Sequence, residues 1–283
     1  MFTSWKEVAA ERTVMALSYL PDVFWNGMSQ FGAWLLDRQK GHIARASIKL
    51  ALPDTEPQHS HQIARASARH SLNYALSLPR LKHISYQLHD LTTVQEAVAE
   101  DRGVIIISLH TGPPDLGTMA LTRAGIHTKT VIGAGKQSPW LNSLGRSALQ
   151  RAGIQFIQRG NPTAVLQAIK QKYAVFLYSD MRAKEMPVTF FGQETSAPAS
   201  GIYAAMLSKT PILFHYCTLA ENGEWQLWFE RFDIELKDNR NDSVQHNLQR
   251  LIHKMEAVIK NHPELWIWHY DRFKLKKKIR KRS

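Results

Sequence analysis

The chain has 283 residues, of which 44% are hydrophobic and 21% are charged, and this composition excludes a disordered protein, a collagen-like fibre and a coiled coil. A chain of this length forms one large domain or two small ones, with ample sequence to bury a core. Its one cysteine, Cys217, excludes an intrachain disulfide and a multi-cysteine zinc site.

The positive charge is concentrated at the C-terminus. The formal net charge is +12, and eight Lys and Arg residues lie among the last twelve positions, beginning at Arg272. The pattern therefore predicts a mildly basic body with a basic tail, not a basic groove. Such a tail can bind an anionic membrane surface. A merely solvated tail and a nucleic-acid-binding tail are the alternatives, and we expect no nucleic-acid partner.

Residues 13–36 form the candidate membrane-contacting segment. The segment is rich in large apolar residues and its only formal charge is Asp22, but Pro21 interrupts it. Its polar residues oppose a spanning helix, so we expect two short amphipathic helices lying in the membrane interface. A buried pair of core helices is the alternative. We expect no secretory signal peptide, because Glu7 and Glu11 precede any apolar run.

The rest of the N-terminal third is also predicted to be helical. Apolar residues recur at helical spacing over residues 62–78. A short helix is expected over 92–100, with Thr92 as its N-cap and Gln95 completing a capping box.

After Gly103 the pattern alternates between strands and helices. The β-branched run at 104–107 is typical of a buried strand. Further strands are expected at 129–132, 154–157, 174–178, 211–219 and 225–235, and helices at 113–124, 140–151, 163–172, 199–207 and 243–260. The alternation predicts an α/β fold with a largely parallel or mixed central sheet flanked by helices, and with a helical N-terminal lobe. We divide the chain into a membrane-associating lobe (1–80), an α/β core (81–275) and a basic tail (276–283).

His110 and Asp115 form the candidate catalytic pair. They lie where the strand at 104–107 ends and the next helix begins, which is where open α/β sheets place their sites. A turn through Pro113 and Pro114 could return Asp115 towards the imidazole. A carboxylate that accepts from Nδ1–H would leave Nε2 free as a general base. A structural, hydrogen-bonded His is the alternative.

Several segments, taken in order, resemble one family. The His-x4-Asp spacing is similar to that of the lysophospholipid acyltransferase superfamily. The segments IQR at 157–159, AVFLYSD at 174–180, FFG at 190–192 before Gly201, and HPELWIWHYDRFK at 262–274 resemble the bacterial lipid A late acyltransferase branch. That branch in turn looks similar to phosphatidylinositol mannoside acyltransferases. The resemblance covers roughly residues 100–275.

The sequence departs from the branch at several positions. Asp115 stands where the branch usually carries Glu, and Arg182 stands where a second acidic residue is common. The turn between His110 and Asp115 lacks the usual aromatic residue. One relative of the branch is thought to transfer glycine from a carrier protein to lipid A, so the resemblance leaves an aminoacyl donor open.

The resemblance implies a peripheral or monotopic acyltransferase on the cytoplasmic face of the bacterial inner membrane. His110 would be the general base and Asp115 its orienting carboxylate, while Arg159, Asp180 and Arg182 would contact substrate. The acyl donor would be a thioester of acyl carrier protein or coenzyme A. The acceptor would be a hydroxyl of lipid A or a related glycolipid. No metal or resident cofactor is required.

Two alternatives remain at this point. One is a glycyl transferase acting on lipid A, and the other is a non-catalytic homologue that binds lipid or nucleic acid. Cys217 is expected in the core, and Trp266, Trp268 and Phe273 are expected to be core or interface anchors.

Overall fold

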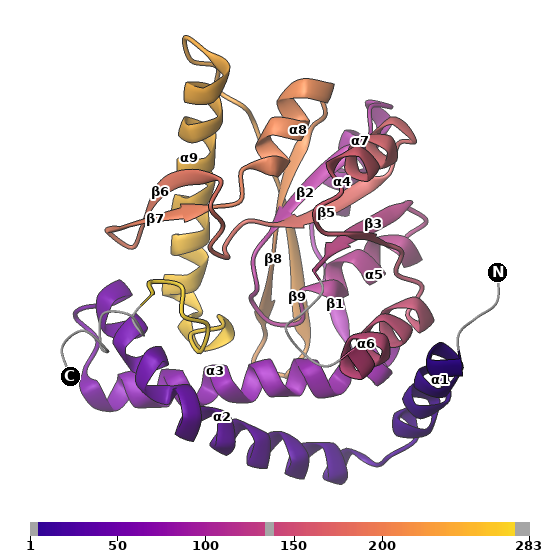
Figure 1. The fold of residues 1–283 in the computed structure, drawn as a ribbon, viewed down its shortest axis with the longest axis vertical. Helices are drawn as coiled ribbons and strands as arrows, with labels where there is room; N and C mark the ends of the chain where they lie inside the picture. Colours follow the sequence, from indigo (N-terminus) through magenta and orange to yellow (C-terminus); the bar gives the residue numbers. More distant parts are fainter. Residues whose placement is uncertain (1–4, 134–138, 275–283) are drawn as a thin grey trace.

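The computed structural model describes residues 5–133 and 139–274. Within these residues the chain forms a seven-stranded sheet with helices on both faces, and a separate two-stranded hairpin. The predicted tail at 276–283 lies outside the described residues. Figure 1 shows the sheet at the centre, α9 along one side, and α2 and α3 along the lower edge.

The central sheet is mixed but mostly parallel, which confirms the predicted fold class. Its order is β1 (Tyr86–Leu88), β9 (Trp225–Phe232), β8 (Ile212–Leu219), β2 (Val104–Ser108), β5 (Ala174–Tyr178), β3 (Thr128–Ile132), β4 (Phe156–Gln158). The β8–β9 pair is antiparallel and every other pair in this sheet is parallel. The loop at 220–224 joins β8 to β9, and Gly223 within it has φ +83°, a conformation that favours glycine.

Side chains of the central strands alternate between two cores, one on each face. On β2, Ile105 and Ile107 point to one cluster and Val104 and Ile106 to the other. The second cluster is covered by α4 (Leu91–Ala99), α5 (Asp115–Arg123) and α6 (Pro139–Arg151). Burial on both faces explains why β2 is an unbroken β-branched run.

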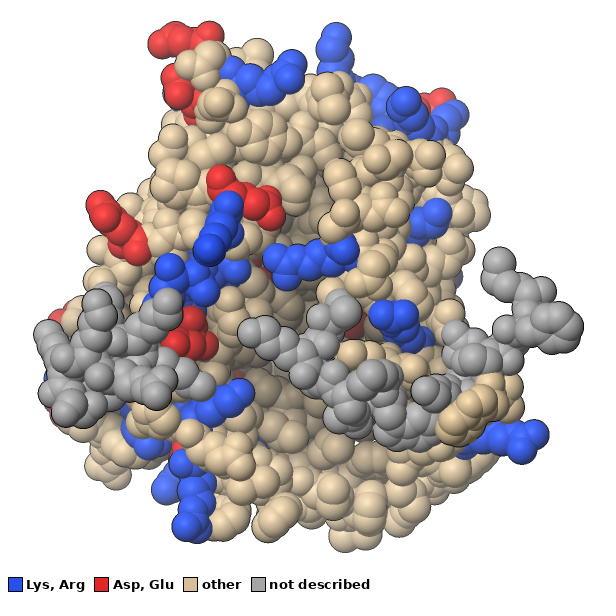
Figure 2. Space-filling view, viewed as in Figure 1, with Lys and Arg blue, Asp and Glu red and all other residues tan. Residues whose placement is uncertain are grey.

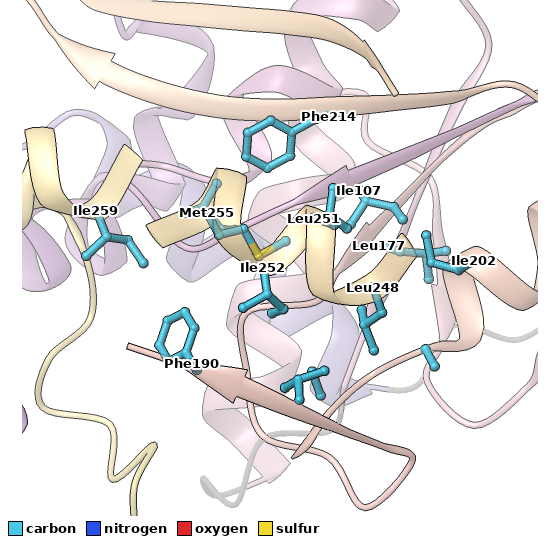
Figure 3. Packing of buried hydrophobic residues seen from close by; sticks show 14 of the residues in the cluster. Ile107, Leu177, Phe190, Ile202, Phe214, Leu248, Leu251, Ile252, Met255 and Ile259 are labelled. Atoms are coloured by element: carbon cyan, nitrogen blue, oxygen red, sulfur yellow. The ribbon is translucent and has the colours of Figure 1, made fainter. Parts of the chain in front are cut away.

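The first cluster is the larger one. It is covered by α7 (Pro162–Lys170), α8 (Ser200–Ser208), α9 (Arg240–Asn261) and the hairpin of β6 (Met186–Phe190) and β7 (Gln193–Ala197). Figure 3 shows α9 side chains between the sheet and the hairpin, with Met255 near Phe214 and Ile252 towards Phe190. The FFG segment therefore serves packing: Phe190 and Phe191 are both buried.

The N-terminal helices are longer than the sequence suggested. Helix α1 (Trp5–Ser18) ends before Pro21, as expected, but α2 (Asp22–Ala51) runs for 30 residues. The C-terminal half of α2 packs on α3 (Pro57–Ser77) through buried small and apolar side chains such as Ala44 and Ile48. None of the described helices is both long and apolar enough to cross a membrane.

One local expectation was wrong. Helix α4 begins at Leu91 after Asp90, which has φ +56°, and no side chain caps it, so the Thr92 capping box does not form. Arg272, the first of the basic residues near the C-terminus, is wholly buried in the folded core. A short 3₁₀ helix (Pro263–Leu265) leads the chain from α9 back under the sheet, and this return carries Arg272 inwards.

Candidate functional site

Two parallel strands bring His110 and Asp180 together. Ser108 and Tyr178, the last residues of β2 and β5, are Cα partners. His110 and Asp180 each follow two residues later, so they leave the sheet side by side. The Nδ1 atom of His110 lies 2.8 Å from Oδ1 of Asp180, and the backbone N–H of His110 donates to Oδ2 at 3.0 Å. The carboxylate thus fixes both the ring and the backbone of His110.

This contact determines which imidazole nitrogen is available. Because a carboxylate can only accept, Nδ1 carries the proton and Nε2 is left as the basic atom. The side chain of Asp180 is fully buried, whereas 28% of the His110 side chain is exposed. His110 is therefore accessible to a substrate, whereas Asp180 is shielded from solvent.

The charges of the pair shift both pKa values. Burial by itself would lower the pKa of His110, but the charge and hydrogen bond of Asp180, with the charge of Asp115, raise it above its ordinary value. Burial would raise the pKa of Asp180, yet the contacts with His110 and Trp266 lower it. Asp180 therefore stays ionised and favours the imidazolium that forms when His110 takes a proton.

Asp115 lies at the start of the helix after β2, as expected, but it does not hold Nδ1 of His110. It begins α5 and is buried, and its Oδ2 accepts a hydrogen bond from the hydroxyl of Tyr74 on α3. Burial raises the pKa of Asp115, against the opposing effects of Tyr74 and His110. The carboxylate in contact with Nδ1 is thus Asp180, while Asp115 acts on His110 through its charge.

Two side chains of the C-terminal segment donate hydrogen bonds to Asp180. The indole N–H of Trp266 donates to Oδ2 of Asp180 at 2.9 Å, and Nε of Arg272 donates to the Asp180 backbone carbonyl at 2.8 Å. Trp266, Trp268 and Phe273 are all buried, which confirms that they are core residues. The contacts of Tyr74, Trp266 and Arg272 were not predicted. Trp266 and Arg272 lie more than 80 positions from Asp180, and Tyr74 lies on α3, far from Asp115 in sequence, so no local pattern joins these residues.

A glycine keeps the turn after β2 compact. Gly112 has φ +60°, and a Cβ there would lie 2.3 Å from the ring of Trp225 on β9. A larger residue would push the turn between His110 and Asp115 away from the sheet. The Thr-Gly-Pro-Pro turn therefore brings its backbone close to the ring of Trp225.

His110 opens into a cavity of about 810 Å³. Much of its wall is apolar and comes from β3, α7, β5 and α8, with Val131, Val165, Leu166, Leu177, Ala204 and Leu207 among the lining residues. Arg159, at the end of β4, and Arg240, at the start of α9, line the same cavity. The structure therefore unites His110 with Arg159 and Asp180, whereas Arg182 lines a separate cavity. In the described ranges, no group of three His, Cys, Asp or Glu side chains could hold a metal ion.

Comparison with known proteins identifies the family of the chain. A search of the curated proteins gives no match. Residues 2–275 match the model of the bacterial lipid A biosynthesis acyltransferases, which is nearly the whole chain. Because this match covers more than half of the chain, the chain belongs to the bacterial lipid A biosynthesis acyltransferase family.

Proposed function

We propose that this acyltransferase moves a fatty acyl group from a thioester to a hydroxyl of a lipid A precursor, with His110 as the general base. The observation that carries the proposal is the His110–Asp180 contact at the mouth of the apolar cavity. Nε2 of His110 would take the proton of the acceptor hydroxyl as its oxygen attacks the thioester carbonyl. The thiolate of the donor then leaves, and the proton on His110 can neutralise it.

Two carboxylates support this step. Asp180 contacts the imidazole and Asp115 lies near enough to raise its pKa. Both stabilise the positive charge that His110 gains in the transition state. Arg159 is exposed in the same cavity and could bind the developing oxyanion or a substrate phosphate.

The cavity favours a fatty acyl donor over a glycyl donor. Its volume of about 810 Å³ and its aliphatic wall suit a hydrocarbon chain, whereas a glycyl group would leave most of that apolar surface wet. Arg159 and Arg240 line the cavity as well, and their charges suit the phosphate of a carrier-protein or coenzyme A thioester.

We further propose that α2 rests on the cytoplasmic face of the inner membrane. Phe24, Met28, Phe31 and Leu35 are exposed and recur at helical spacing, and Trp34 lies beside them. Residues 23–36 carry no formal charge. Figure 2 shows mostly uncharged surface along the lower edge, where α2 lies in Figure 1. An exposed aromatic stripe of this kind suits the lipid interface, where the acceptor resides.

Mass spectrometry of lipid A tests the proposed reaction. A host that lacks the gene is compared with the same host expressing the wild-type chain or His110→Ala. We expect a mass gain of one fatty acyl group that is lost in the variant. A gain of one glycyl residue would replace the acyl donor by an aminoacyl donor. Equal acylation by a folded His110→Ala protein would refute His110 as the base.

A further inference from the structure

A second cavity, of about 670 Å³, lies on the other side of the loop that carries Asp180. It is bounded by the β6–β7 hairpin, α9 and the segment at 272–274, and it shares no lining residue with the cavity at His110. The loop at Asp180–Arg182 separates the two: Met181 lines the first cavity and Arg182 the second. No residue that lines this second cavity takes part in the proton transfer proposed above.

The second cavity is lined by an excess of positive charge. Arg182, Arg272 and Lys274 face it, against the single carboxylate of Glu194. His246, which also lines it, is paired with Glu235 at 2.6 Å. Figure 2 shows Lys and Arg side chains, with Asp and Glu side chains beside them, on the part of the surface where the hairpin lies in Figure 1. The chemistry of the lining therefore suits an anion.

Arg272 is the decisive residue, because it is a wholly buried cation. Its Nε donates to the backbone carbonyl of Asp180, and its Nη1 donates to the hydroxyl of Thr195 at 2.6 Å. Its Nη2 has no hydrogen-bond partner among the described residues. The carboxylate of Asp180 is occupied by His110 and Trp266, so it forms no ion pair with the guanidinium.

Arg182, which lies beside Arg272, also has a buried nitrogen, Nε, without a hydrogen-bond partner within the described part of the chain. Burial lowers the pKa of Arg272 to about 10; the charge of Asp180 opposes this, and the charge of Arg182 adds to it. A buried cation beside a second cation is costly unless an anion compensates it. Guanidinium groups bind phosphate through their N–H donors, and one buried donor that no described residue accepts from is present on each of Arg182 and Arg272.

We propose that the second cavity is a binding site for a phosphate group, held by Arg182 and Arg272. The group can be free inorganic phosphate or the phosphate of a phosphorylated glycolipid acceptor, and the latter source rests on the function proposed above. A phosphate bound there would touch the loop whose other side carries the carboxylate of the His110–Asp180 pair. It would thereby stabilise the position of that loop and of Asp180.

Isothermal titration calorimetry with inorganic phosphate, at low ionic strength, tests the site directly. Arg182→Gln removes one of the two guanidinium groups, and Lys184→Gln is the matched control. Lys184 is exposed on the same loop and lines neither cavity. We expect Arg182→Gln to weaken phosphate binding at least tenfold and Lys184→Gln to change it less than twofold. Undetectable binding to the wild type, or equal weakening by both variants, would overturn the site.

A second arm identifies the source of the phosphate. Affinity for a phosphorylated disaccharide glycolipid and for its dephosphorylated form is measured in detergent micelles with His110→Ala. If the acceptor supplies the group, inorganic phosphate competes with the phosphorylated form, and adding Arg182→Gln abolishes the difference between the two lipids. If phosphate binds without competing, the site takes free phosphate. The site fails independently of the reaction: transfer that depends on His110, with phosphate binding insensitive to Arg182→Gln, refutes the site alone.

Discussion

Nδ1 of His110 lies 2.8 Å from Oδ1 of Asp180, although 70 residues separate them in sequence. Each stands two positions beyond a register pair of parallel strands, Ser108 on β2 and Tyr178 on β5. Sheet register, not the length of the local turn, therefore selects the carboxylate that faces the imidazole.

Asp180→Asn should lower kcat by about a hundredfold or more, because the amide no longer fixes the tautomer or stabilises the imidazolium. Steady-state transfer from a thioester donor measures the effect. The pH at which activity is half-maximal should also fall, since the pKa of His110 loses the charge that raises it. A variant with wild-type kcat and an unchanged pH profile would contradict the role of Asp180.

Activity and stability should respond to pH in opposite directions. The neutral imidazole is the base, so kcat/KM should rise as pH rises through the folded-state pKa of His110, which lies above its ordinary value of 6.5. The protonated imidazole is the form that Asp180 stabilises. Its contribution to the free energy of unfolding is therefore fully present below the unfolded pKa and is lost as pH rises through the folded one. Chemical denaturation across this range, with His110→Gln as the reference, measures the difference. A wild-type-minus-variant difference that grows with pH would contradict this sign.

Trp266→Phe should reduce kcat by about tenfold, because it removes the indole N–H that donates to Asp180 while keeping an aromatic ring in the core. The lost donor should also make the Asp180 carboxylate more basic and so raise the pKa of His110, so the pH at which activity is half-maximal should rise. Trp268→Phe is the control, since that indole donates to the backbone of Pro263 instead. Equal effects of the two variants on the pH profile would mean that Trp266 acts only through packing.

Gly117→Ala should destabilise the chain by about 1–3 kcal/mol through overpacking. A Cβ at this position of α5 would lie 2.2 Å from Nε2 of His215, which is wholly buried on β8. Gly145→Ala on α6 is the control: a Cβ there has nothing within 4 Å, and the change should stabilise the helix by about 0.5–1 kcal/mol. Urea unfolding measures both, and a neutral Gly117→Ala would show that α5 can move away from the sheet.

Phe31→Gln combined with Trp34→Gln should weaken binding to anionic lipid vesicles by about tenfold or more, because two exposed aromatic anchors are lost. Vesicle co-sedimentation measures this. Leu236→Gln is the control, since Leu236 is a large exposed apolar residue outside α2. Weakening of the same size by the control would refute α2 as the membrane-contacting surface.

Part of the fold could be predicted from local sequence patterns. The β-branched run of β2 and the strand–helix alternation after it gave the sheet, and His110 was placed at its edge. The three-residue strand β1 and the β6–β7 hairpin were missed, since the former is too short for a pattern and the latter contains Pro187 and turns at Phe191 and Gly192. The partner of Nδ1 was misassigned because it depends on pairing between distant strands. The burial of Arg272 was not predicted, because it comes from the chain turning back after α9.

The contacts on Asp180 also set the order in which the site can be completed. Its carboxylate and its backbone carbonyl are held by Trp266 and Arg272, which follow the last long helix. A chain grows from its N-terminus, so His110 and Asp180 are both made well before either donor exists. A nascent or truncated chain that stops at Asn261 would contain the whole central sheet and every lining residue of the cavity at His110. It would nevertheless lack the two side chains that hold Asp180, so catalytic competence should arrive only with the final stretch of synthesis.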